Sequence, residues 1–147
     1  MSDAITNPPD FQRVITASTS GDLNALVAFF TDDAVVMPPN DTTLFGTEEI
    51  REWWKEYFQW FEVTSSVVTD SNLTVAGDQA FHRGSLSIVI QPKGKGEQIR
   101  DDVRSLIVWR RQTDGVWKIS HQIWNSTRPV GSGTSRYISR MIQKKSS

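Results

Sequence analysis

The sequence contains two histidines, the side chains best suited to exchanging protons near neutral pH. His121 follows Trp117 and Ile119 at alternate positions, so in a β-strand the three side chains are predicted to share one face. In an apolar cavity, a neutral imidazole at this position can serve as a general acid or base. The alternative is a buried or interfacial histidine that donates a single hydrogen bond. His121 is therefore a candidate catalytic residue.

Asp102 and Arg104 form a second candidate pair, because a carboxylate beside a guanidinium can take a proton and orient a substrate. Both fall on one face of a predicted strand, whereas Asp101 offers a competing carboxylate on the other face. The alternative is an ordinary ion pair near a strand end. We predict catalytic roles for Asp102 and Arg104, and the spacing leaves open which face of the strand points inward.

Six tryptophans in a chain of 147 residues exceed the needs of a small core, which predicts a cavity or an interface lined by large rings. Tyr57 could donate a hydrogen bond to a developing oxyanion, or it could be a core aromatic with its hydroxyl at the rim. Consecutive helical positions diverge by about 100°, so Trp53 and its neighbouring rings cannot all face one pocket. The candidate ligand-binding residues are Trp53, Tyr57, His82, Trp117 and Asn125.

A metal site is conceivable but weakly indicated. His82, His121 and Asp102 could make a set of two histidines and one carboxylate, yet they are scattered over three predicted strands. The absence of cysteine excludes disulfides, thiol catalysis and thiolate metal ligands. We predict neither a metal nor a cofactor.

Helices that would position these residues are indicated by capping residues and apolar periodicity. Asp10 and Asp22 are predicted to cap the first two helices, with Gly21 between them, and Asp32-Asp33 is predicted to end the second. A third helix is predicted with Thr47 as its cap. It carries a wide apolar stripe that needs a broad surface, such as the concave face of a sheet: Ile50, Trp53, Trp54, Tyr57, Phe58 and Phe61.

The remaining segments read as strands. A short strand over 34–37 precedes four long ones over 63–75, 79–91, 98–111 and 116–125, joined by short glycine-containing turns. This pattern predicts an α+β protein with an antiparallel meander. From Leu106 to Trp109 both strand parities are apolar, so both faces of the sheet should be covered. Helices can cover one face, and a homodimer through the outer face would cover the other.

Composition sets the broad class. The apolar fraction is 37%, the charged fraction is 22% and the net charge is −1, as expected for a globular protein with no field that recruits nucleic acid. No apolar run approaches the roughly 20 residues of a membrane helix, and the N-terminus lacks a signal-peptide pattern, so we expect a cytoplasmic protein. We predict one domain over 1–126 and a basic, partly flexible tail over 127–147 that could form a short helix or remain solvated.

Three stretches of the sequence carry a resemblance to a known family: Phe30–Pro38, Gly46–Arg51 and Trp109–Asn125. They resemble the nuclear transport factor 2-like superfamily, which includes ketosteroid isomerases and SnoaL-like polyketide cyclases. The similarity extends over roughly 11–126 and is closest to stand-alone members akin to the association domain of calmodulin-dependent kinase. It implies a curved antiparallel sheet forming a cone, with about three helices on its concave face, a ligand in its mouth and a partner on its outer face.

One departure from that superfamily limits the functional expectation. Ketosteroid isomerases carry a carboxylate base near the end of the first strand, where this sequence has Met37-Pro38-Pro39, so their mechanism is not supported. We predict an enzyme that uses acid–base chemistry on a small apolar or aromatic substrate, of lyase, isomerase, cyclase or hydrolase type. The alternatives are a ligand-binding module without turnover and a dimeric assembly domain.

Overall fold

The computed structural model describes residues 9–129, so the predicted tail lies outside the described residues from position 130 onward. Within 9–129, no helix is both long and apolar enough to cross a membrane. The α+β class is confirmed, and the four long predicted strands agree with β3 to β6 to within two residues at each end. The elements are α1 (Phe11–Ser20), α2 (Leu23–Val27), β1 (Phe30–Met37), β2 (Leu44–Phe45), α3 (Gly46–Trp60), β3 (Phe61–Ala76), β4 (Gln79–Pro92), β5 (Ile99–Arg111) and β6 (Trp117–Ser126).

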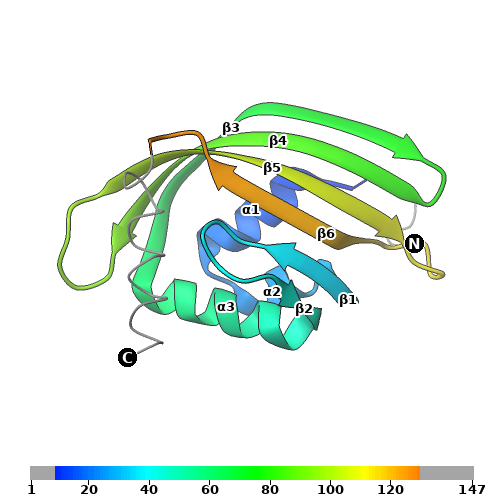
Figure 1. Ribbon diagram of the computed structural model, residues 1–147, viewed down its shortest axis with the longest axis horizontal. Coiled ribbons are helices and arrows are strands. Elements are labelled where there is room, and N and C mark those ends of the chain that lie inside the picture. Colours follow the sequence, from blue (N-terminus) through cyan, green and yellow to red (C-terminus); the bar gives the residue numbers. More distant parts are fainter. Residues whose placement is uncertain (1–8, 130–147) are drawn as a thin grey trace.

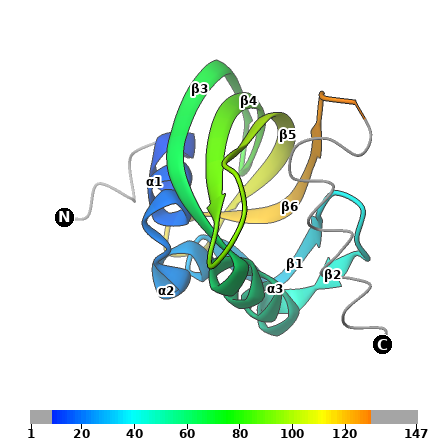
Figure 2. The same cartoon turned by 90° about the vertical axis from the view of Figure 1, so that its left-hand side faces the viewer.

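The six strands form one curved sheet in the order β2-β1-β6-β5-β4-β3. All neighbours are antiparallel except β1 and β6, so the meander is confirmed for β3 to β6 and a parallel strand is added beside it. Register shifts in β3 and between β5 and β6 mark irregularities of the kind that bend a sheet. The sheet arches over the three helices, which lie on its concave side (Figure 1) and close its lower opening (Figure 2). We call this side the inner face.

The first two helices begin as predicted. The Asp10 carboxylate accepts a hydrogen bond from the backbone N–H of Gln12 at 2.9 Å, and the Asp22 carboxylate accepts one from Ala25 at 3.0 Å. Gly21 ends α1 with a φ of 71°, a left-handed conformation that a residue with a Cβ adopts only at a cost. These caps set the angle between α1 and α2.

The third helix begins differently from the prediction. Its N-cap is Phe45, and the backbone N–H of Phe45 donates to Glu49 Oε2 at 2.6 Å. Thr47 therefore lies inside the helix, and its predicted role as the cap is wrong. The carboxylate of Glu49 reaches back over the first turn and accepts from the N–H of the N-cap residue itself, as the acidic member of a capping box does.

The second helix is shorter than predicted, and Asp32 and Asp33 do not end it. Both lie in β1, which begins at Phe30 and not at position 34. Asp33 accepts hydrogen bonds from Thr31 Oγ1 at 2.9 Å and from Arg110 Nη2 at 2.7 Å, and these bonds lower the pKa of its carboxyl group. The predicted helix end was wrong because long-range pairing with β6 draws this segment into the sheet.

Helix α1 packs on the sheet through an aromatic contact with a buried histidine. The ring of Phe11 lies 4.3 Å from that of His82, centroid to centroid, and His82 Nε2 lies 2.8 Å from Ser71 Oγ. Gly84 makes room for both rings, since a Cβ atom there would lie 2.7 Å from His82 Cε1 and 2.9 Å from Phe11 Cε1. The missing side chain at Gly84 thus determines how closely α1 approaches β4.

Replacing Gly84 by alanine should destabilise the protein, because the added methyl group must displace two packed rings. We expect Gly84→Ala to lower the free energy of unfolding by about 1–3 kcal/mol in urea titrations. Ser85→Ala, on the other face of the same strand, should change it by about 0.5 kcal/mol or less. Equal stability of the Gly84→Ala variant and the wild type would contradict the close packing of α1.

Stability should also depend on pH through His82. Burial lowers the pKa of His82 below its ordinary 6.5, and the negative charge of Asp70 offsets part of this effect. A proton then binds the unfolded chain more readily than the folded one, so the contribution of neutral His82 is present above pH 6.5 and is lost as the pH falls below it.

In urea titrations, a change from about pH 7 to about pH 5 should lower the free energy of unfolding of His82→Gln less than that of the wild type. The wild-type imidazole should titrate, by NMR, with a midpoint below 6.5. A midpoint above that value would rule out the burial effect.

Candidate functional site

A cavity of about 100 Å³ lies between the inner face of the sheet and the helices. Most of its lining is apolar or aromatic and comes from all three helices and strands β3 to β6. Among the described residues that line it, none is a lysine, arginine, histidine, aspartate or glutamate. The polar side chains of the lining, besides the tryptophan and tyrosine rings, are Ser18, Ser66, Ser105 and Gln122.

Four aromatic rings from α3 and β6 form one wall of the cavity. Trp53 stacks on Tyr57 with ring centroids 5.6 Å apart, and Trp54 stacks on Trp124 at 5.9 Å. The Trp53 indole N–H donates to Asp41 Oδ2 at 3.0 Å, which holds that ring from outside the cavity. The structure thus places Trp53 and Tyr57 in the cavity lining, where a ligand-binding role is possible.

Two residues of the lining carry buried polar atoms without a hydrogen-bond partner: Trp54 Nε1 and Gln122 Oε1. Neither residue is in the predicted set of ligand-binding residues. The alternation of β6 does not single out Gln122, because it leaves open which parity faces inward; in the structure Gln122 and Trp124 point inward, whereas His121 and Ile123 are exposed. Buried polar groups are nearly always paired, so an unpaired one beside a cavity indicates where a ligand group or a water belongs.

Tyr57 is kept in its neutral form. Burial raises the pKa of its hydroxyl far above the ordinary 10.0, and the negative charge of Asp101 adds to this effect. The hydroxyl can therefore donate a hydrogen bond but does not act as a phenolate. Asp101 is 1% exposed and accepts hydrogen bonds from Asp102 N at 2.9 Å and Ser126 Oγ at 2.5 Å.

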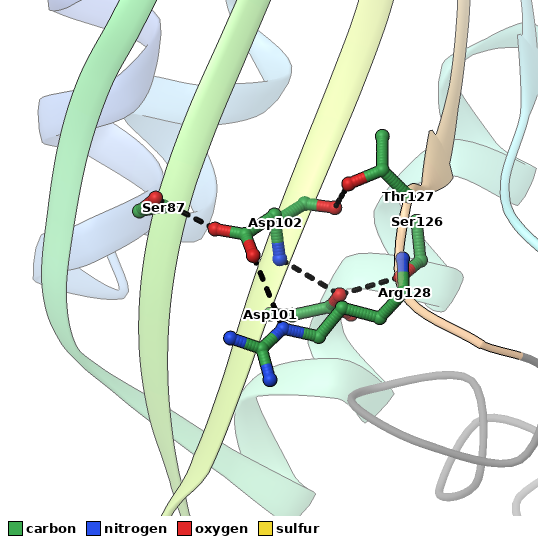
Figure 3. Close-up of polar contacts among 6 residues, drawn as sticks. All are labelled: Ser87, Asp101, Asp102, Ser126, Thr127 and Arg128. Atoms are coloured by element: carbon green, nitrogen blue, oxygen red, sulfur yellow. Dashed lines mark hydrogen bonds and ion pairs between the residues drawn. The ribbon is translucent and has the colours of Figure 1, made fainter.

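The alternation of β5 decides between the two competing aspartates. Odd-numbered residues of β5 face the helices, so Asp101 points inward, whereas Asp102 and Arg104 lie on the outer face. Figure 3 shows the two aspartates turned to different partners. Asp102 accepts hydrogen bonds from Ser87 Oγ at 2.7 Å and from Arg128 Nε at 3.1 Å, and these lower the pKa of its carboxyl group.

The predicted pairing of Asp102 with Arg104 is therefore absent, because Asp102 forms its ion pair with Arg128 instead. Arg104 is exposed, and its Nε donates to Asn125 Oδ1 at 3.1 Å. Asn125 is exposed on the same outer face. These three predicted site residues lie on the sheet surface opposite the cavity, with β5 and β6 between.

His121 is also exposed on the outer face, and its predicted alignment with Ile119 is wrong. Val108 pairs with His121, whereas the next residue, Trp109, pairs with Ile119, so one extra residue is inserted in β6. The shift leaves Ile119 fully buried and turns His121 outward, with its Nδ1 3.1 Å from Ser120 Oγ. A strand without this irregularity would have put both on one face.

The two other predicted ligand-binding residues do not line the cavity. His82 faces inward but lies beneath Phe11, and Trp117 lies beside Arg111, whose guanidinium carbon is 5.7 Å from its ring centroid. Since His82 is inside and His121 is outside, they cannot join Asp102 in one metal site. Within the described part of the chain, no three potential ligands among His, Cys, Asp and Glu lie close enough to hold a metal ion.

Several solved structures have the same fold. A ketosteroid isomerase-like protein from Erwinia carotovora atroseptica has a TM-score of 0.73 and 22% identity, over 80% of this chain and 91% of that one. A candidate aromatic ring hydroxylase from Novosphingobium aromaticivorans has a TM-score of 0.71 and 20% identity, over 86% and 97%. A candidate calcium/calmodulin-dependent protein kinase II association domain from Xanthomonas campestris has a TM-score of 0.69 and 16% identity, over 82% and 84%.

At these identities the three structures establish the fold and not the activity. No curated protein matches the sequence. Residues 11–124 match the family described as SnoaL-like domain. This range contains all nine helices and strands of the described chain, apart from the last two residues of β6. The curved sheet, the three helices and this match agree, and the chain belongs to the SnoaL-like domain family.

Proposed function

We propose that the protein binds a small, largely apolar or aromatic molecule in the cavity between the sheet and the helices. The observation that carries this proposal is the lining itself, which combines stacked rings with a few polar groups and, among the described residues, contains no ionised side chain. Ligand sites in proteins are typically apolar hollows with a small number of placed polar groups. A cavity of about 150 Å³ lined by apolar side chains admits benzene. This cavity is smaller, at about 100 Å³, so it suits a molecule of no more than one ring.

Ligand binding explains the cavity better than acid–base catalysis does. The predicted proton-transfer group, His121, is on the outer face together with Asp102 and Arg104, so it cannot reach a molecule in the cavity. The catalytic roles of these three residues stay predictions, and they would serve a molecule bound on the outer face. Of the groups that line the cavity, Tyr57 alone titrates, and its neutral hydroxyl offers hydrogen bonding to a ligand.

The cavity can be tested by filling it. Ser105 points inward from β5 and lines the cavity, so Ser105→Leu replaces a hydroxyl group by a larger isopropyl group where the ligand would lie. We expect toluene to bind the wild type in calorimetric titrations and to bind Ser105→Leu at least about tenfold more weakly. Ser85→Leu, on the outer face of the neighbouring strand, serves as the control and should bind toluene like the wild type. Unchanged binding by Ser105→Leu would place the site elsewhere.

We further propose that the outer face of the sheet joins a second copy of the chain. Two rows of side chains cross this face, one from β2 to β4 and one from β1 to β4, and in them apolar residues alternate with polar ones. A face of this kind is typical of a protein–protein interface, and one face that meets itself builds a twofold dimer. The exposed apolar members are Phe45, Phe81, Leu106 and Ile123, and the half-buried ones are Val35, Met37 and Val108.

A charge at the centre of this face should dissociate the dimer. Leu106 is 48% exposed and lies between Arg83 and Ile123, so a lysine there is tolerated in a monomer but must be desolvated in a dimer. We expect the wild type to sediment as a dimer and Leu106→Lys to raise the dissociation constant at least about tenfold. Val75→Lys, 51% exposed at the far end of β3, should remain dimeric. A monomeric wild type at high concentration would refute the proposal.

A further inference from the structure

The cavity walls contain two polar atoms that nothing in the described chain satisfies. Trp54 Nε1 can only donate a hydrogen bond, and Gln122 Oε1 can only accept one. Both atoms are shielded from solvent, and both belong to side chains that line the cavity, one from α3 and one from β6. Leaving such groups unpaired is costly, so an occupant that pairs with them gains more than one that only fills the space.

The neighbouring tryptophan provides a comparison within the same helix. Trp53 also lines the cavity, but its indole N–H is already bonded to Asp41 at 3.0 Å. Trp54 Nε1 has no such partner, and its ring is held by stacking on Trp124. The indole N–H of Trp54 is therefore a donor without a partner among the described residues, on a ring whose orientation is set by stacking on Trp124.

The electrostatic character of the cavity restricts the charge of its occupant. Among the described residues of the lining there is no cationic side chain that could pair with an anion and no carboxylate that could pair with a cation. Tyr57 is neutral. Asp101, the carboxylate whose charge raises the pKa of Tyr57, already accepts hydrogen bonds from Ser126 and from the backbone N–H of Asp102. An ionised ligand would lose its hydration without compensation, so the cavity favours a neutral one.

We propose that the cavity selects a neutral, single-ring molecule that carries both a hydrogen-bond acceptor and a donor, as a phenol does. This inference rests on the proposed function. Trp54 donates to the acceptor and Gln122 accepts from the donor, so these two side chains determine specificity. The stacked rings contact the face and edge of the ligand. Binding requires no covalent step and no charge transfer.

Three probes of similar size separate the contributions: toluene, phenol and benzoate. Toluene fills the cavity without polar groups. Phenol adds one hydroxyl and, with a pKa of about 10 like the tyrosine side chain, stays neutral at neutral pH. Benzoate is ionised there. In calorimetric titrations of the wild type we expect phenol to bind at least about tenfold more tightly than toluene, and benzoate to bind more weakly than both.

Variants that remove the polar atoms test the two assigned residues. Trp54→Phe and Gln122→Leu should each reduce the preference for phenol over toluene by about fivefold. Gln122→Leu nearly keeps the side-chain volume and should also leave toluene binding within about twofold of the wild type, whereas Trp54→Phe removes part of the ring and is judged by the preference alone. Trp60→Phe, on the same helix but outside the cavity lining, is the matched control and should keep the full preference.

An NMR measurement reports the contact directly and does not depend on a variant that folds. Phenol should shift the indole N–H signal of Trp54 more than toluene does, whereas the signal of Trp53 should move little because its donor stays on Asp41. A toluene response as large as the phenol response would contradict a hydrogen bond from Trp54.

The outcomes separate this inference from the proposed function. If toluene and phenol bind the wild type with equal affinity, the selection by Trp54 and Gln122 is refuted while the apolar cavity stands. If benzoate binds most tightly, the inference that the cavity excludes charge is wrong. If none of the three probes binds, both the inference and the proposed function fail.

Discussion

The structure depends on how one aromatic helix face is buried against a curved sheet. Strands β3 to β6 bend over the helices, and their concave face must be covered by apolar side chains. Helix α3 supplies Trp53 and Tyr57, both almost fully buried. Phe11 of α1 packs on β4, on the same concave face of the sheet. Large, rigid rings cover much area but cannot fill every gap in a curved surface, and a cavity remains where they meet the sheet.

The same packing explains why the cavity contains polar groups without partners. Ring stacking fixes the orientation of Trp54 against Trp124, so its N–H cannot turn toward solvent. Gln122 points inward from β6, and its Oε1 atom is buried without a hydrogen-bond partner among the described residues. In a cavity used only for packing, apolar residues would serve better at both positions. The unsatisfied atoms are therefore best understood as binding groups.

The cavity lining and the outer face of the sheet divide neutral and charged chemistry between them. Of the adjacent residues Asp101 and Asp102, the first faces the helices without lining the cavity, and the second pairs with Arg128 on the outside. Arg104 and His121 belong to the outer face as well. Ionisable groups remain hydrated there and also interrupt the exposed apolar rows, which limits non-specific association while leaving a face that can meet its copy.

Local sequence patterns alone determined the helices at Asp10 and Asp22, the four long strands and the aromatic stripe of α3, because capping and periodicity act over a few residues. They also predicted that Trp53 and Tyr57 belong to the pocket. Only the tertiary structure decided which strand parity faces inward. One extra residue in β6 puts His121 and Ile119 on different faces of the sheet. Such an irregularity arises when β6 pairs with β5, so the sequence of β6 alone does not reveal it.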